Sequence, residues 1–167
     1  AKHKYEIEKY IIKNFRKYKI LRISKVYDNN IKGGTLLVKW MLQFKNKENI
    51  FCADDNYFTP IHIDDVCKMT KKIMNIKNSG IFHLASNKSL SRKEMLQKII
   101  KKIKPKILKQ LNIKYQSLHS FKGAENQPLN TSLNCIKTNR IIGLKAKDLN
   151  HNINKILKNK ILKNLQK

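Results

Sequence analysis

This chain of 167 residues lacks the features that define several protein classes. Its three cysteines, Cys52, Cys67 and Cys135, are odd in number and widely spaced, which excludes a disulfide framework and the usual spacing of a zinc site. We therefore expect a reducing, cytoplasmic compartment. The five histidines are scattered, and we expect no metal site. No run of about 18 apolar residues occurs, so the sequence predicts no membrane span. Neither a G-x-G-x-x-G nor a Walker pattern is present.

Arginine is scarce too, although the chain carries a formal net charge of +26. Of 37 basic residues, only Arg16, Arg22, Arg92 and Arg140 are arginine, whose planar fork is the usual reader of phosphate and guanine. Lysine is spread over nearly every segment alongside isoleucine and asparagine, and these three residues share A/T-rich codons. A biased genome explains this composition. The alternative is a small basic protein that binds nucleic acid or another polyanion without catalysis, which predicts lysines on one face and salt-dependent affinity.

Segments of helical periodicity alternate with short apolar strands. We expect strands at residues 18–27, 49–53, 59–63, 79–86 and 113–118, and helices at residues 2–17, 35–44, 65–76, 90–103, 133–142 and 148–165. Asp64 is the expected N-cap of the third helix, and Ser91 with Glu94 has the capping-box spacing. Pro105 interrupts the lysine-rich run after the fourth helix. The alternation predicts an α/β fold with a mostly parallel sheet, and so narrow a sheet indicates an incomplete one.

Three local patterns each allow a functional and a structural interpretation. Gly33-Gly34 precedes a helix and could offer backbone N–H groups to an anion, or be a flexible loop. The basic stretch 98–114 could lie on an anionic membrane or RNA, although a solvated outer helix face explains it as well. Asp54 and Asp55 could form a carboxylate pair, but their place in a turn favours a structural role. Asp64 and Asp65 fit a helix start, where carboxylates complement the dipole.

Four segments, in a set order, resemble one family: "ILRISKVYDNN", "DDNYFTPIHIDDVCKM", "GIFHLASNKSLSRKEMLQKI" and "ENQPLNTSLNCIKTNRIIGL". Together they are similar to the C-terminal half of the extended short-chain dehydrogenase/reductases, in the sugar-nucleotide branch typified by dTDP-4-dehydrorhamnose reductase. The resemblance implies the C-terminal part of a Rossmann-like doubly wound parallel sheet plus a small substrate-binding α/β subdomain. Residues 1–167 would be a single truncated unit. Within it, residues 1–84 would carry the end of the catalytic helix and the remaining Rossmann-like elements, and residues 85–167 would mainly bind substrate.

The family's catalytic helix carries Tyr-x-x-x-Lys followed by a glutamate four residues later. Tyr5 and Lys9 match the first pattern literally, but Lys9 is too near Arg22 for the helix and turn that family members place there. Lys4 fits that distance, and Glu8 follows it correctly. The resemblance therefore implies that Lys4 is the catalytic lysine and a contact of NAD or NADP. The tyrosine would precede Ala1, and the glycine-rich turn is absent, so we expect the chain alone to bind dinucleotide poorly and to be inactive.

Further roles follow from the same resemblance. Ser24 would border the cofactor and Lys25 the sugar, at the end of the first strand. Asn126 and Gln127 would belong to the loop that closes over a nucleotide-sugar substrate, where Gln127 replaces the family's arginine before Pro128. A homodimer and non-specific polyanion binding are further expectations. The implied function is that of a reductase or epimerase fragment, and neither the sugar nor the choice of NAD or NADP follows from the sequence.

Overall fold

The computed structural model describes residues 2–159 and 162–165 of the chain. Its strands form four two-stranded pairs, three of them parallel. The pairs are β1 (Lys19–Ile23) with β6 (Gly80–Leu84), β2 (Val26–Tyr27) with β5 (Ile61–His62), β3 (Ile50–Ala53) with β8 (Ile113–Gln116), and the antiparallel β4 (Tyr57–Phe58) with β7 (Leu90–Ser91). The helices are α1 (Lys2–Asn14), α2 (Leu36–Asn46), α3 (Ile63–Asn75), α4 (Arg92–Ile100), α5 (Pro105–Leu108), α6 (Ile136–Ile142) and α7 (Leu149–Leu157). Short 3₁₀ turns cover Leu118–Ser120 and Lys163–Leu165.

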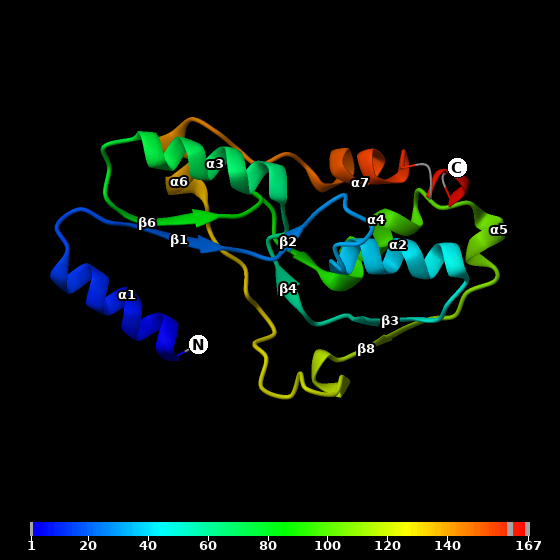
Figure 1. Cartoon of the computed structure of the whole chain (residues 1–167). Coiled ribbons are helices and arrows are strands. Elements are labelled where there is room, and N and C mark those ends of the chain that lie inside the picture. The colour runs from blue at the N-terminus through cyan, green and yellow to red at the C-terminus, as the bar shows by residue number, and fades with distance from the viewer. Residues whose placement is uncertain (1, 160–161, 166–167) are drawn as a thin grey trace.

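The elements are arranged in layers around the parallel pairs. In Figure 1, α3 and α1 lie on opposite sides of the β1–β6 pair, and α2, α4 and α7 gather at the other end of the molecule. β1 pairs with β6 in register, so that Arg22 lies opposite His83. Because parallel strands need long crossovers, the helices cover the sheet as expected for an α/β protein.

Two large hydrophobic cores hold these layers together, and a third, small cluster surrounds Leu118. One combines α2, α4 and α7, where Trp40, Phe44 and Leu96 are almost completely buried. The other joins α3 to β6 and α6 through Met69, Ile73, Phe82, Leu84 and Ile142. Fully burying a large apolar side chain contributes about 1.5–3 kcal/mol. Both cores draw residues from either side of residue 84, and the division of the chain there stays a prediction.

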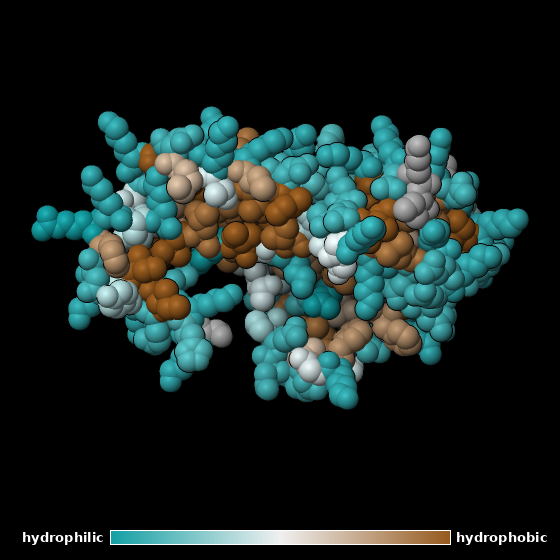
Figure 2. Space-filling view, in the orientation of Figure 1, coloured by the Kyte–Doolittle hydropathy of each residue, from teal (hydrophilic) through white to brown (hydrophobic). Residues whose placement is uncertain are grey.

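Helix α1 differs from the other long helices because none of its side chains is buried. Tyr5, Ile7, Tyr10, Ile12 and Phe15 are 44–62% exposed, and β1 beside it pairs with only one strand among the described residues. The brown patch at the lower left of Figure 2 marks exposed apolar surface at this end of the molecule. Apolar residues gathered in this way on one surface are typical of an interface.

Several expected boundaries are wrong, each for a local reason. The strand predicted at 18–27 is two strands, because the chain leaves β6 at Ser24 and continues beside β5. The N-cap of α3 is His62 rather than Asp64: its Nδ1 accepts from the Asp64 backbone N–H. Asp64 and Asp65 occupy the first turn instead, where carboxylates complement the dipole.

The last two predicted helices are shorter than expected. α6 starts at Ile136 because the Asn134 side chain accepts from the Ile136 N–H in a local turn. α7 ends at Leu157, and a separate 3₁₀ turn follows at Lys163–Leu165. The first helix likewise ends at Asn14 rather than Lys17, and the fourth ends at Ile100 rather than Ile103. The capping box of Ser91 and Glu94 at the start of the fourth helix is confirmed, because both of its hydrogen bonds are present.

Candidate functional site

A cleft of about 580 Å³ lies at the carboxyl end of β1. It is lined by residues of α1, of the β1–β2 junction and of the segment before α6: Lys4, Glu8, Leu21, Arg22, Ile23, Ser24, Lys25, Val26, Thr131 and Leu133. Figure 2 shows a hollow on this face, between α1 and the segment that precedes α6. Ligands of open α/β sheets bind beyond the carboxyl ends of the strands, so the position suits a binding site.

An ion pair fixes the position of α1 against β1. The Arg22 guanidinium donates through Nε and Nη2 to both carboxylate oxygens of Glu8, with Nε–Oε1 at 3.1 Å. The hydrogen bonds from Arg22 lower the pKa of the Glu8 carboxyl, and those to Glu8 raise the pKa of Arg22. Lys4 and Glu8 are four residues apart and share one face of α1. The ion pair therefore holds the Lys4 side chain at the cleft.

Lys4, rather than Lys9, faces the cleft. The Lys9 ammonium lies 4.4 Å from the centroid of the Tyr5 ring, an arrangement typical of a cation–π contact, and neither residue lines the cleft. Of the two lysines that the sequence offered, only Lys4 lines the cleft, and its role as the family lysine stays a prediction.

Ser24 is nine-tenths buried at the end of β1, and its hydroxyl has a defined orientation. The Leu133 N–H donates to Thr59 Oγ1 at 3.1 Å, and Thr59 in turn donates to Ser24 Oγ at 3.0 Å. Since Thr59 uses its one proton on Ser24, the Ser24 proton stays available for a further acceptor. Ser24 can therefore act as a hydrogen-bond donor to a ligand in the cleft.

The cleft is positively charged. Glu8 neutralises Arg22, while Lys4 and Lys25 have no ion-pair partner among the described residues. Lys25 is exposed at the break between β1 and β2, where its carbonyl accepts from the Ile61 N–H. Two unpaired ammonium groups in one concavity favour an anionic ligand such as a phosphate ester.

Asn126 and Gln127 do not line this cleft. Both are exposed, and the Gln127 amide donates to the Gly123 carbonyl at 3.3 Å within its own loop. The loop reaches the cleft only through Thr131 and Leu133, two lining residues that the sequence patterns did not indicate. No local signal could have identified them, because their proximity to β1 depends on how the segment after Pro128 folds back.

Asp55 holds the start of this loop in place. Its carboxylate accepts from Ser117 Oγ at 2.6 Å and from the Leu118 N–H at 2.7 Å, and these hydrogen bonds lower its pKa. Leu118 is buried against Ala53 and Ala124. Asp55 therefore has a structural role, as its place in a turn predicts.

The Gly33-Gly34 loop does not suit a phosphate. A Cβ on Gly33 would meet Asp28 Oδ2 at 2.6 Å, and the Asp28 carboxylate accepts from the Thr35 hydroxyl at 3.3 Å. A carboxylate at this loop repels an anion, so the flexible-loop interpretation is the better one. The described residues contain no group of three or more acidic, histidine or cysteine side chains arranged to hold a metal ion. None of the helices within residues 2–159 and 162–165 has the length and hydropathy needed to cross a membrane.

Comparisons with known proteins address the family and the fold. The family model of the RmlD substrate binding domain matches residues 1–161. A crystal structure of dTDP-4-dehydrorhamnose reductase from Bacillus anthracis in complex with NADP is similar, with a TM-score of 0.72 and 21% identity, over 92% of this chain and 53% of that chain. UDP-glucose 4-epimerase from Thermotoga maritima matches with a TM-score of 0.64 and 16% identity, over 89% of this chain and 47% of its own.

A third structure, UDP-glucuronic acid 4-epimerase from Bacillus cereus with UDP-glucuronic acid and NAD, has a TM-score of 0.65 and 17% identity, over 90% of this chain and 47% of that one. The chain thus spans about half the length of these structures. No curated protein matches it. The expected fold, the C-terminal part of a Rossmann-like sheet, is confirmed. Because the family model covers nearly the whole sequence, this chain belongs to the RmlD substrate-binding domain family.

Proposed function

We propose that this chain is the sugar-nucleotide-binding portion of an NAD(P)-dependent reductase or epimerase of the extended short-chain type. The observation that carries the proposal is the cleft at the end of β1, where Lys4, Ser24 and Lys25 meet. Its two unpaired ammonium groups suit the diphosphate and hydroxyl groups of a nucleotide sugar. The matched reductase and epimerases act on ligands of this class by their names, and two of them were solved with NADP or with NAD.

The residues of the cleft fit the nicotinamide end of a dinucleotide. The Lys4 ammonium would donate to the ribose hydroxyls, and the Ser24 hydroxyl, already oriented by Thr59, would donate to a carbonyl or hydroxyl beside them. The nicotinamide ring supplies or accepts the hydride when it is bound. Arg22 and Glu8 act indirectly, because their ion pair keeps Lys4 in place.

The remaining contacts would come from a cofactor-binding half. The exposed apolar side chains of α1 and the free edge of β1 form the face on which such a half would pack. Asn126 and Gln127 would reach the sugar nucleotide only if their loop moved toward the cleft, since neither lines it.

The test is the binding of dTDP, UDP and their hexose conjugates, measured by isothermal titration calorimetry. Lys25→Ala should weaken binding about 10-fold, the effect of losing roughly 1.4 kcal/mol of a charge-assisted contact. Lys32→Ala is the matched control, because Lys32 is also exposed but does not line the cleft. Equal losses in both variants, or no binding to any nucleotide, would contradict the proposal. Equal losses together with salt-dependent binding of any DNA would favour the polyanion-binding alternative.

A further inference from the structure

A second cavity, of about 140 Å³, shares no lining residue with the cleft. Four separate parts of the chain line it: Pro60, the loop between β6 and β7, Lys98 of α4, and the segment that leads into α7. Its residues are Pro60, Ser86, Asn87, Lys88, Leu90, Lys98, Ala146, Lys147, Asp148 and Leu149. The cavity holds roughly four or five waters at about 30 Å³ each, so it is too small for a nucleotide.

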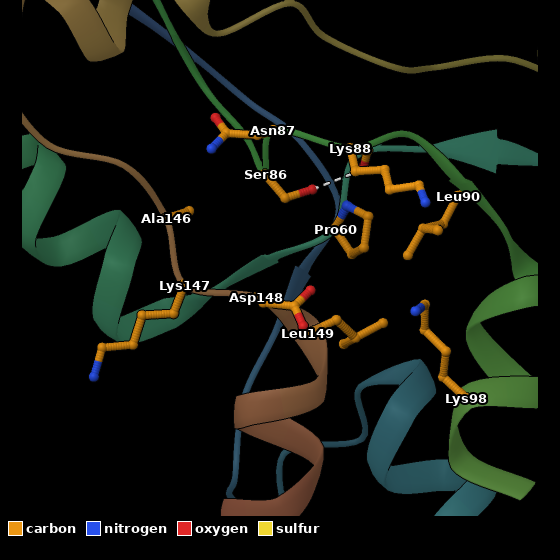
Figure 3. Close-up of a pocket in the computed structure, with 10 residues that line it drawn as sticks. All are labelled: Pro60, Ser86, Asn87, Lys88, Leu90, Lys98, Ala146, Lys147, Asp148 and Leu149. Atoms are coloured by element: carbon orange, nitrogen blue, oxygen red, sulfur yellow. Dashed lines mark hydrogen bonds between the residues drawn. The ribbon is translucent and has the colours of Figure 1, made fainter. Parts of the chain in front are cut away.

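Lysine side chains dominate the charge of this cavity. Figure 3 shows the ammonium ends of Lys88 and Lys98 directed into it, whereas Lys147 points away. Neither Lys88 nor Lys98 has an ion-pair partner within the described parts of the chain. Lys98 is half-buried, and this reduces the water available to solvate its charge.

The one carboxylate in the lining does not balance these charges. Asp148 is the N-cap of α7, and its Oδ2 accepts from the Asn150 N–H at 3.2 Å. Lys88 and Lys98, which point into the cavity, and the single Asp148 leave it with a formal net charge of about +1. The Ser86 hydroxyl donates to the Lys88 carbonyl at 3.0 Å, which fixes the backbone of the loop that carries Lys88.

The walls of the cavity strengthen an electrostatic interaction within it. The Pro60 ring and the buried side chains of Leu90 and Leu149 form the apolar part of the lining. Opposite charges beside apolar walls attract one another more strongly than opposite charges in open water, because the local dielectric constant is lower. The start of α7 adds a partial positive charge on the same side.

We propose that this cavity is a binding site for a small oxyanion of the phosphate class, held between the ammonium groups of Lys88 and Lys98. Its size and its charge both match such an ion. The bound anion would connect the β6–β7 loop, α4 and the start of α7, so it would stabilise the packing of the C-terminal helix on the rest of the fold. The site is independent of the function proposed for the cleft.

The test uses inorganic phosphate, with sodium chloride at matched ionic strength as the reference. Phosphate should raise the melting temperature of the protein above the chloride value, and a calorimetric titration should show a single site. Lys98→Gln and Lys88→Gln should each weaken phosphate binding at least 10-fold. Lys101→Gln is the control, because Lys101 is exposed just after α4, does not line the cavity and gives the same change in net charge.

The outcomes are distinct. Retained binding in Lys101→Gln with loss in the two cavity variants supports the site. An equal reduction in all three variants would show diffuse attraction to a basic protein and would overturn the proposal. Phosphate that stabilises no more than chloride would do the same, because a specific site raises the stability of the folded state when its ligand binds. Lys88 is exposed, so its replacement tests the site even if Lys98→Gln folds poorly.

Discussion

Replacing Asp55 by alanine should release the loop of residues 117–131 while the rest of the fold stays intact. The carboxylate holds this loop through two short hydrogen bonds, from Ser117 Oγ at 2.6 Å and from the Leu118 N–H at 2.7 Å. Hydrogen bonds to a charged group contribute about 1.5–3 kcal/mol each when buried. Asp55 is partly exposed, so solvent reduces this to about 1 kcal/mol each. The variant should therefore lose about 2 kcal/mol of local stability.

Amide hydrogen exchange measures this loss directly. A cost of about 2 kcal/mol makes the opening of the loop roughly 30-fold more frequent, since each 1.4 kcal/mol is tenfold. The exchange of the Leu118 amide and its neighbours should accelerate by that factor, and exchange in α2 and α4 should not change. Ser117→Ala, which removes one of the two bonds, should give about half of the effect in free energy.

Asp54→Ala is the matched control, because the Asp54 side chain has no hydrogen bond or ion pair within the described ranges. Equal exchange rates in the Asp54 and Asp55 variants would refute the role of Asp55. The pH dependence gives a second check. The folded-state pKa of Asp55 is lowered, so its contribution is complete above the usual carboxyl pKa and disappears as the pH falls through the lowered one.

Two further predictions concern the body of the fold. Arg22→Met should destabilise the protein by about 0.5–1 kcal/mol in urea unfolding and increase amide exchange in α1. The loss of stability should be smaller at 1 M salt, because the Glu8–Arg22 pair is partly exposed. Unchanged exchange in α1 would show that the ion pair does not hold the helix. Burial lowers the pKa of His62, so the stability of the protein should be greatest above the ordinary histidine pKa and fall as the pH drops through the lowered folded value. His62→Gln should reduce the slope of stability against pH between pH 7 and 5, whereas replacement of the exposed His151 by Gln should not. An equal slope in the parent protein and both variants would exclude His62 as the cause.

The cleft and the second cavity clarify how the high net charge is used. Most lysines are exposed and have no specific partner that the structure identifies, as a codon-driven composition predicts. At two places the fold instead positions unpaired ammonium groups in the lining of a concavity: Lys4 with Lys25 in the cleft, and Lys88 with Lys98 in the second cavity. At these two places the charge can become selective, because a shaped site fixes the distance between charges and an open surface does not.

The sequence by itself determined the class of the fold and the position of most elements. The alternation of apolar strands with amphipathic helices is a local property, and so is the capping box of Ser91 and Glu94, whose hydrogen bonds span three residues. The four-residue spacing of Lys4 and Glu8 also fixes that their side chains share one face of a helix. The choice of Lys4 as the catalytic lysine came from the family resemblance and stays a prediction.

The tertiary structure decided what depends on segments distant along the chain. The break at Ser24 arises because β1 leaves its pairing with β6 while β2 pairs with β5, and no pattern within residues 18–27 encodes that exchange. Thr131 and Leu133 lie in the cleft, Asp55 bonds to residues 62 and 63 positions further on, and the cavity around Lys98 combines four separate parts of the chain. Local periodicity carries no information about such contacts, because they form only when packing brings separate elements together.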